Sequence, residues 1–324
     1  MKKIIVTKNL PFEIEKSFKN YNLVYNKSSE PLSRDKLQKE LFDADGIISM
    51  LSDKIDATML ENAKNLKVVA NYAVGFNNID VDYCSKKKIV VCNTPHVLTE
   101  ATAELGFALI ISAARRIVEA DKFVRQGKFK GWEPTLFLGH GLQHKTLGIY
   151  GFGKIGQTLA NFARNFKMNI IYNSRSRKRH EENLIDAQYV TFEHLLDKSD
   201  FLVVTAPLNT STKHQFTKNE FKRMKNSSVF INLGRGEIIK ESDLAEALEN
   251  GEIAYAGLDV YEFEPSVNKK LLNMDNVILL PHIGSATVTA RKEMAGLCVQ
   301  SVKEVLEKNN LPWNAVNKNF IVDK

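Results

Sequence analysis

The sequence TLGIYGFGKIG occupies Thr146–Gly156 and joins an apolar run typical of a β-strand to the start of a helical pattern. Its three separated glycines have different tasks: Gly151 turns the chain, Gly153 lets a pyrophosphate approach the backbone, and Gly156 lets the helix pack closely on the strand. Backbone N–H groups at the start of a helix face such phosphates, and the helix dipole favours their negative charge. The segment therefore predicts a dinucleotide-binding βαβ unit.

Strand-like and helical patterns alternate on both sides of this segment. Six apolar runs predict the strands of a doubly wound Rossmann sheet: Thr146–Tyr150, Asn169–Asn173, Phe201–Thr205, Ser228–Leu233, Ala254–Asp259 and Asn276–Leu280. Four earlier runs predict a smaller parallel sheet: Lys3–Thr7, Gly46–Met50, Leu66–Tyr72 and Ile89–Asn93. The predicted fold class is α/β, with a Rossmann dinucleotide-binding domain and a smaller, flavodoxin-like substrate domain.

Helices rather than flexible linkers mark the predicted domain boundaries. One long helical pattern covers residues 99–126 and ends before Gly127, a residue that favours helix ends. Its centre is apolar nearly all round, which predicts burial against another domain or another subunit. A last helix, Val288–Lys308, is expected to pack back on the first domain. We therefore predict a discontinuous substrate domain, residues 1–98 plus 287–324, and a dinucleotide-binding domain, residues 99–286.

The charge and cysteine content point to an ordinary cytoplasmic protein. The 45 lysines and arginines are spread among 38 acids, so the net charge of +7 predicts anion attraction and no nucleic-acid partner. Three cysteines, Cys84, Cys92 and Cys298, lack metal-ligand spacing and are expected to be buried thiols with no metal. The longest apolar helical run, near Phe107–Ala114, is too short to span a bilayer, so no membrane partner is expected.

Three segments at the ends of predicted strands could perform chemistry beside a nicotinamide. Reduction of a carbonyl needs a cation that polarises it, a proton donor, and a group that keeps the donor charged and oriented. Arg235 projects between two glycines, which we expect to clear space around its guanidinium. Acids at Asp259–Glu264 follow the next strand, and His282 follows the one after that. All of these residues are predicted to lie at one edge of the sheet.

In this order, the segments resemble those of the D-isomer-specific 2-hydroxyacid dehydrogenases, and most closely the glyoxylate/hydroxypyruvate reductases. The resemblance covers almost the whole chain. It includes VANYAVGFNNID at Val69–Asp80 and LTEATAE at Leu98–Glu104, besides the glycine fingerprint and the Arg235, Glu264 and His282 segments.

The resemblance implies a role for each catalytic residue. Arg235 would bind the 2-oxo acid and polarise its carbonyl, and His282 would donate the proton during reduction. Glu264 would pair with His282, and its negative charge favours the imidazolium. The substrate-binding residues implied are Ala73, Val74, Gly75, Arg235 and His282, with the Val74–Gly75 backbone N–H groups on the substrate carboxylate.

The resemblance also implies a cofactor-binding set. Asp259 would contact the nicotinamide carboxamide, Thr102 would lie near the nicotinamide, and Pro207 and Thr212 would border the adenosine half. The full set is Thr102, Gly151, Phe152, Gly153, Lys154, Ile155, Gly156, Ser174, Arg175, Ser176, Pro207, Thr212, Leu233, Gly234, Arg235, Asp259, His282 and Gly284.

The second predicted strand of the Rossmann sheet bears on which nicotinamide is bound. An acid about 20 residues beyond the fingerprint holds the 2′-hydroxyl of NAD. Here Asn173 stands at that place, and Ser174, Arg175 and Ser176 follow it. Hydroxyl and guanidinium groups suit a 2′-phosphate. We therefore expect NADP(H) to be preferred, with NAD(H) possible; the alternative is that these residues form a solvated basic loop.

The substrate expected from the resemblance is glyoxylate or hydroxypyruvate, reduced to glycolate or D-glycerate. D-lactate, glycerate and phosphoglycerate dehydrogenases are close alternatives, and a dinucleotide-sensing corepressor of the same fold is a non-enzymatic one. Trp132, in the loop after the long helix, fits either a substrate pocket or simple interface packing. The family generally forms homodimers through that long helix and its loop, so a homodimer is expected.

Overall fold

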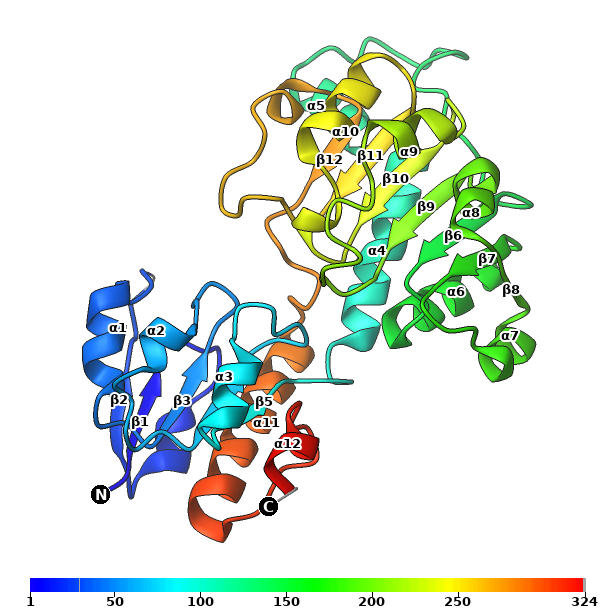
Figure 1. Ribbon diagram of the computed structural model, residues 1–324. Coiled ribbons are helices and arrows are strands. Elements are labelled where there is room, and N and C mark those ends of the chain that lie inside the picture. The colour runs from blue at the N-terminus through cyan, green and yellow to red at the C-terminus, as the bar shows by residue number, and fades with distance from the viewer. Residues whose placement is uncertain (29, 323–324) are drawn as a thin grey trace. The chain divides into compact units, whose positions relative to one another are not determined.

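The computed structural model describes residues 1–28 and 30–322 of the chain. The chain divides into two compact units (Figure 1). The first unit comprises Met1–Leu98 together with Ala286–Lys324, and the second comprises Thr99–Ser285. None of the helices in the described ranges combines the length and the apolar character needed to cross a membrane.

The first unit contains a five-stranded sheet in the order β2-β1-β3-β4-β5, with every pair parallel. This is the flavodoxin-like order. The strands are β1 (Lys3–Val6), β2 (Asn22–Tyr25), β3 (Gly46–Ser49), β4 (Val68–Asn71) and β5 (Val90–Cys92). The three central strands β1, β3 and β4 are almost fully buried, as expected for parallel strands covered on both faces.

Helices from both ends of the chain complete the first unit. The short helices are η1 (Ile14–Phe18), α1 (Arg34–Leu41), α2 (Ala57–Leu60), α3 (Val81–Lys86) and α12 (Lys318–Val322). Helix α11 (Val288–Lys308) packs against β3, β4 and β5 (Figure 1). A Cβ on Gly46 of β3 would lie 3.4 Å from Leu306 Cδ1 of α11, so helix and sheet are in close contact.

The second unit contains a seven-stranded parallel sheet in the order β12-β11-β10-β9-β6-β7-β8. This is the Rossmann order with one further strand, β12, at the edge. The strands are β6 (Thr146–Tyr150), β7 (Asn169–Asn173), β8 (Ala187–Tyr189), β9 (Phe201–Val204), β10 (Val229–Asn232), β11 (Tyr255–Leu258) and β12 (Val277–Leu279). The predicted α/β class with two parallel sheets is confirmed.

Helices cover both faces of the second sheet, and alternate strand residues enter two different cores. Leu147 and Ile149 of β6 pack with residues of α4 (Thr99–Ala114) and α6 (Lys154–Asn165). Leu202 and Val204 of β9 instead pack with residues of α8 (Phe192–Lys198), α9 (Lys218–Arg223) and α10 (Glu241–Glu249). The remaining elements are α5 (Ile117–Arg125), α7 (Arg179–Ile185), η2 (Gly236–Ile238) and η3 (Leu271–Asn273).

The prediction of one long helix over residues 99–126 is wrong, because the chain forms two helices there. Helix α4 ends at Ala114, and Arg116 adopts a left-handed conformation with φ 53° before α5 begins. The backbone N–H of His140, from the following loop, donates to the Ala114 carbonyl at 2.8 Å. The Arg116 guanidinium also lies over the Phe137 ring of that loop. Contacts with a segment distant in sequence thus replace continued helical hydrogen bonds.

Two strands, β2 and β8, were not predicted. Both are edge strands of four and three residues. The side chains of β2 are half-buried or exposed, so the short run NLVY lacks the continuous buried, apolar pattern by which the other strands were predicted. Such strands form because a neighbouring strand offers its hydrogen-bonding edge.

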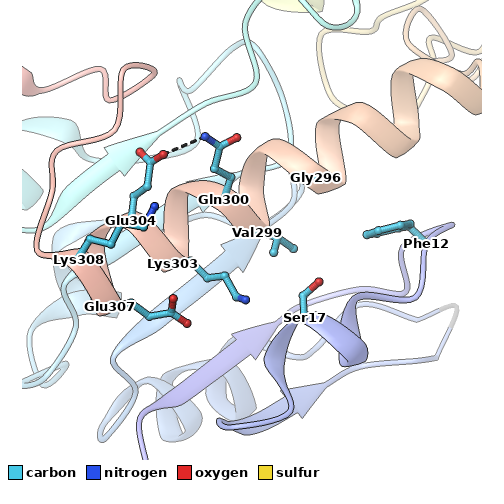
Figure 2. Close-up of a pocket in the computed structure, with 9 residues that line it drawn as sticks. All are labelled: Phe12, Ser17, Gly296, Val299, Gln300, Lys303, Glu304, Glu307 and Lys308. Atoms are coloured by element: carbon cyan, nitrogen blue, oxygen red, sulfur yellow. Dashed lines mark hydrogen bonds between the residues drawn. The ribbon is translucent and has the colours of Figure 1, made fainter.

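A polar surface pocket of about 400 Å³ lies in the first unit between η1 and α11 (Figure 2). Figure 2 shows charged side chains of α11 around it and the hydrogen bond from Gln300 to Glu304 at 2.9 Å. Its lining residues are Phe12, Ser17, Gly296, Val299, Gln300, Lys303, Glu304, Glu307 and Lys308. None of these is a predicted site residue, so the pocket is distinct from the candidate active site.

Candidate active site

The glycine fingerprint forms the turn between β6 and α6, and its three glycines have different surroundings. Gly151 has φ 96°, and a Cβ there would lie 2.5 Å from the backbone N of Ala206. A Cβ on Gly156 would lie 2.6 Å from the Gly151 carbonyl oxygen and 3.1 Å from an Ile149 side-chain carbon. By contrast, a Cβ on Gly153 would meet nothing within 4 Å. Gly151 and Gly156 therefore serve the turn and the packing, while Gly153 leaves its backbone open.

The Arg235 segment follows β10 at the carboxyl edge of the sheet. A Cβ on Gly236 would lie 1.8 Å from the carbonyl carbon of Tyr261, and one on Gly234 would lie 2.7 Å from the Ala206 carbonyl oxygen. These contacts give both glycines a role that was not predicted from the sequence. They are required because the backbone on either side of Arg235 touches the backbone of other loops.

The side chain of Arg235 is half-buried at this edge. Its Nη1 donates to the Gly234 carbonyl at 2.7 Å. Burial lowers the pKa of Arg235, while the nearby Glu264 and Glu237 carboxylates oppose that shift. A guanidinium remains charged under such conditions, so Arg235 presents a fixed cation at the edge of the sheet.

The His282 ring contacts the Glu264 carboxylate directly. Nδ1 of His282 lies 2.9 Å from Oε2 of Glu264, and the other carboxylate oxygen accepts from the Tyr261 N–H at 3.1 Å. Burial alone would raise the pKa of Glu264, but the bond to His282, with Tyr261 N–H and the charge of Arg235, lowers it. The pair therefore holds a charged carboxylate against Nδ1, and this contact does not involve Nε2 of the ring.

Asp259 holds the loop that carries His282. Its two carboxylate oxygens accept hydrogen bonds of 2.7 Å from the backbone N–H groups of Ile283 and Gly284. Burial raises the pKa of Asp259, and these two bonds oppose the shift. A Cβ on Gly284 would lie 3.1 Å from Asp259 and 3.3 Å from Thr102, so these three predicted residues lie together. His282 itself has φ 55°, a left-handed conformation fixed by this loop.

The loop after β7 contains Ser174, Arg175 and Ser176, which the sequence predicts to contact the cofactor. Ser174 donates to the Ser176 carbonyl at 2.9 Å, and the Arg175 side chain is exposed. Asn173 does not point freely toward a ligand, because its amide donates to the Val190 carbonyl at 2.8 Å. Within the described ranges, Arg175 takes part in no ion pair.

Other predicted cofactor residues are held by contacts within the protein. Phe152 as a whole is 1% exposed, and its ring stacks on the Tyr172 ring at 3.9 Å, so this predicted cofactor residue has almost no accessible surface. The Thr212 hydroxyl donates to the Pro207 carbonyl at 2.8 Å and closes that loop. Lys154 is exposed at the first turn of α6, with Ile155 half-buried behind it.

The predicted carboxylate-binding residues Ala73, Val74 and Gly75 belong to the first unit, directly after Tyr72 at the end of β4. Ala73 is buried, whereas Val74 and Gly75 are half-buried. This loop therefore exposes backbone at the carboxyl edge of the first sheet, where parallel α/β sheets bind ligands.

Residues 107–284 match the model of a known protein family, described as D-isomer specific 2-hydroxyacid dehydrogenase, NAD binding domain. The match spans more than half of the chain and includes the fingerprint, Arg235, Glu264 and His282. The chain belongs to the D-isomer-specific 2-hydroxyacid dehydrogenases. The family predicted from the sequence is confirmed.

Individual members of this family resemble the chain over nearly its full length. A glyoxylate reductase of Thermococcus litoralis is 46% identical, covering 98% of each chain. The structure of a glyoxylate reductase from Paecilomyes thermophila is 32% identical, with a TM-score of 0.87, and covers 97% of this chain and 98% of its own. An NADPH-dependent glyoxylate/hydroxypyruvate reductase of Sinorhizobium meliloti, solved with NADP and malonate, is 29% identical with a TM-score of 0.87, covering 98% and 97%.

The residues of this dehydrogenase fit a nicotinamide dinucleotide. The open backbone at Gly153 lies at the N-cap of α6, where helix N–H groups and the dipole favour a pyrophosphate. Thr102, Asp259 and Gly284 come together beside the His282 loop. The family and this geometry together assign the second unit to a nicotinamide cofactor.

Asparagines that position the site loops were missed in the sequence. Asn232, fully buried, donates to the Arg235 carbonyl at 3.0 Å and accepts from the Gly234 N–H at 3.0 Å. Asn71 and Asn93 bind the loop that contains Val74 and Gly75. Each asparagine is a polar residue at or near the end of an otherwise apolar strand run, and that position is the signal by which the sequence could have indicated it. The three runs are INL, VAN and VCN.

Proposed function

We propose that this dehydrogenase reduces glyoxylate or hydroxypyruvate to glycolate or D-glycerate with NADPH. The observation that carries the proposal is the His282–Glu264 pair at 2.9 Å on the same sheet edge as the half-buried Arg235. A cation, a proton donor and an anion that orients the donor are the groups that carbonyl reduction requires.

Each group would have one task. Arg235 would bind the oxygen atoms of the 2-oxo acid and withdraw electron density from its carbonyl. His282 would give the proton on Nε2 to the carbonyl oxygen, while Glu264 holds the proton on Nδ1. A bound reduced nicotinamide supplies the hydride. The backbone N–H groups at Val74 and Gly75 would bind the substrate carboxylate.

The preference for NADPH rests on the loop after β7. Ser174, Arg175 and Ser176 offer hydroxyl, guanidinium and backbone donors where an acid would favour NAD. Arg177 forms a bidentate ion pair with Glu182 and is therefore not the residue that we assign to a 2′-phosphate. NADH remains a possible second cofactor.

A homodimer and a cytoplasmic location are part of the same proposal. Helix α5 exposes Ile117, Val118 and Val124, which are 46%, 48% and 57% exposed. Apolar side chains grouped on one helix favour contact with another protein surface. The three cysteines are free and buried, as suits a reducing compartment.

One panel tests the proposal: oxidation of NADPH and of NADH is followed with glyoxylate, hydroxypyruvate, pyruvate, 3-phosphohydroxypyruvate and a branched 2-oxo acid. The highest kcat/KM is expected for NADPH with glyoxylate or hydroxypyruvate. A higher value for pyruvate would favour a D-lactate dehydrogenase. Cofactor binding without turnover of any 2-oxo acid would favour a dinucleotide-sensing interaction protein.

A further inference from the structure

Three successive carbonyl groups of the loop after β4 are bound by the protein. The Ala73 carbonyl accepts from the Thr94 N–H at 2.8 Å, and the Val74 carbonyl accepts from the Asn93 side-chain amide at 2.7 Å. The Gly75 carbonyl accepts from the Asn71 side-chain amide at 2.8 Å. All three peptide planes are therefore fixed in orientation.

This arrangement determines where the N–H groups of the same peptides point. In a trans peptide the C=O and N–H bonds point to opposite sides. The N–H groups of Val74, Gly75 and Phe76 thus face away from the groups that bind the three carbonyls. Within the part of the chain that the structure describes, none of these N–H groups donates a hydrogen bond to the protein. Val74 and Gly75 are half-buried and Phe76 is exposed, so the loop that carries these donors lies at the surface of the unit.

We propose that Asn71 and Asn93 are positioning residues, which preset these backbone N–H groups for a carboxylate. The inference rests on the proposed function, because the carboxylate is that of the 2-oxo acid. Neither asparagine would touch the substrate. Each would act through the carbonyl that it binds, and the loop would need no reorganisation when the anion arrives.

The Asn71 side chain is fully buried, and all four of its hydrogen-bonding capacities are used. Its amide donates to Gly75 at 2.8 Å and to Asn78 at 3.2 Å. Its oxygen accepts from Ser49 at 3.1 Å and from Asn78 at 3.3 Å. Asn78 in turn donates to the Met50 and Asp53 carbonyls of the neighbouring loop. Asn71 is therefore held in a single orientation.

Asn93 is fixed by a second set of contacts. Its carbonyl accepts from the Asn314 amide at 2.6 Å, and the Asn314 oxygen accepts from the Ser301 hydroxyl of α11 at 3.1 Å. Asn93 thus connects the loop to the last long helix of the chain. Two independent networks hold the two neighbouring carbonyls.

Asn71→Leu and Asn93→Leu test the inference, because leucine is similar in size but cannot donate to a carbonyl. Each variant is expected to raise the KM for glyoxylate about tenfold, the loss expected when one hydrogen bond to a charged group weakens. The Kd of oxamate, a carboxylate analogue of the substrate, should rise by a similar factor in the presence of NADPH. Since the substrate carboxylate is bound equally in the ground state and the transition state, kcat should change by less than about threefold. The Kd of NADPH should not change.

Asn317→Leu is the matched control. Asn317 is a fully buried asparagine of the same unit, and its amide donates to the Ile89 carbonyl at 2.9 Å, outside the loop. It should lower the melting temperature as the other two variants do and leave both the KM for glyoxylate and the Kd of oxamate unchanged. Equal KM values in Asn93→Leu and Asn317→Leu would overturn the inference.

The inference and the proposed function fail in different ways. A wild-type protein that reduces no 2-oxo acid contradicts the proposed function, whatever the variants do. If the wild type is active and Asn71→Leu does not fold, the inference is tested with Asn93→Leu and with Asn93→Ser, which introduces a smaller side chain. The KM for glyoxylate and the Kd of oxamate are then measured for these two variants. Loss of kcat with unchanged KM and oxamate binding in these variants would also contradict a positioning role.

Discussion

Glu264 accepts a hydrogen bond from the Tyr261 N–H with one oxygen and contacts Nδ1 of His282 at 2.9 Å with the other. The carboxylate therefore connects the loop after β11 with the loop after β12. Because these loops follow adjacent strands, the alignment of the His282 ring depends on the sheet itself.

His282→Ala should slow reduction of glyoxylate by roughly a hundredfold or more, because the proton donor is removed. The matched control is His214→Ala, which removes a second histidine–glutamate pair in the same unit, His214 with Glu262 at 2.7 Å. Single-turnover rates with saturating NADPH measure the effect. A turnover number like that of the wild type in His282→Ala would refute the assignment.

Glu264→Gln should move the pH dependence of reduction. The pKa of Glu264 lies below its ordinary value of 4.5: burial raises it, but the bond to His282 and its charge, the Tyr261 N–H and the charge of Arg235 together outweigh burial. The carboxylate is therefore charged above that range, and its stabilising effect is lost only as the pH falls through the lowered pKa. Glu264→Gln has no charge to lose at low pH, so its kcat should be lower than that of the wild type and should not show the further decline that protonation of Glu264 causes as the pH falls. An unchanged pH–rate profile would show that the pair is merely structural.

Arg235→Ala should reduce kcat/KM by about a hundredfold or more, corresponding to roughly 3 kcal/mol of transition-state binding. Arg235→Lys should recover only part of this loss, because a lysine cannot form the bidentate pair. As a control, Arg223→Ala removes an exposed guanidinium paired with Asp197. Full activity in Arg235→Lys would indicate that charge alone matters at this position.

Gly236→Ala should destabilise the protein and lower kcat together. Its Cβ would overlap the Tyr261–Glu262 backbone, which forces the Arg235 loop away from the loop of Glu264. Gly296→Ala is the contrasting change, since that glycine lies exposed within α11 and a Cβ there meets nothing within 4 Å. It should stabilise the protein by about 0.5–1 kcal/mol. Thermal unfolding and kcat of both variants provide the measurement.

Ser174→Asp combined with Arg175→Ala should shift the cofactor preference toward NADH. The introduced carboxylate repels a 2′-phosphate and accepts from a ribose 2′-hydroxyl. The ratio of kcat/KM for the two cofactors should change by at least about tenfold, while Arg179→Ala, at an exposed position on α7, should leave it unaltered. A clear NADH preference already in the wild type would contradict the proposal.

The sequence predicted what depends on local signals and missed what depends on distant partners. The fingerprint was identified because Gly151 and Gly156 are required by the turn and by its own helix. The break at Arg116 could not be predicted, since its cause is a hydrogen bond from His140 to Ala114. The contacts that require glycine at positions 234 and 236 could not be predicted for the same reason, because Tyr261 and Ala206 come from other loops.

The candidate site shows the same division. Arg235, Glu264 and His282 stand beside recognisable strand ends, and the structure brings Glu264 and His282 into contact. Asn71 and Asn93 gave only a weak signal, because their importance lies in the carbonyl groups that the folded chain places opposite them.

The contact of α11 with β3 and β4 has a consequence for the order of events during translation. These strands are among the first parts of the chain to leave the ribosome, yet the helix that packs on them is synthesised near the end. The whole of Thr99–Ser285 emerges in between and contains every strand of its own sheet. The second unit can therefore fold before the first unit is complete. During that time apolar surface of the first unit stays uncovered, and chaperones can bind it until the residues beyond 286 have been synthesised.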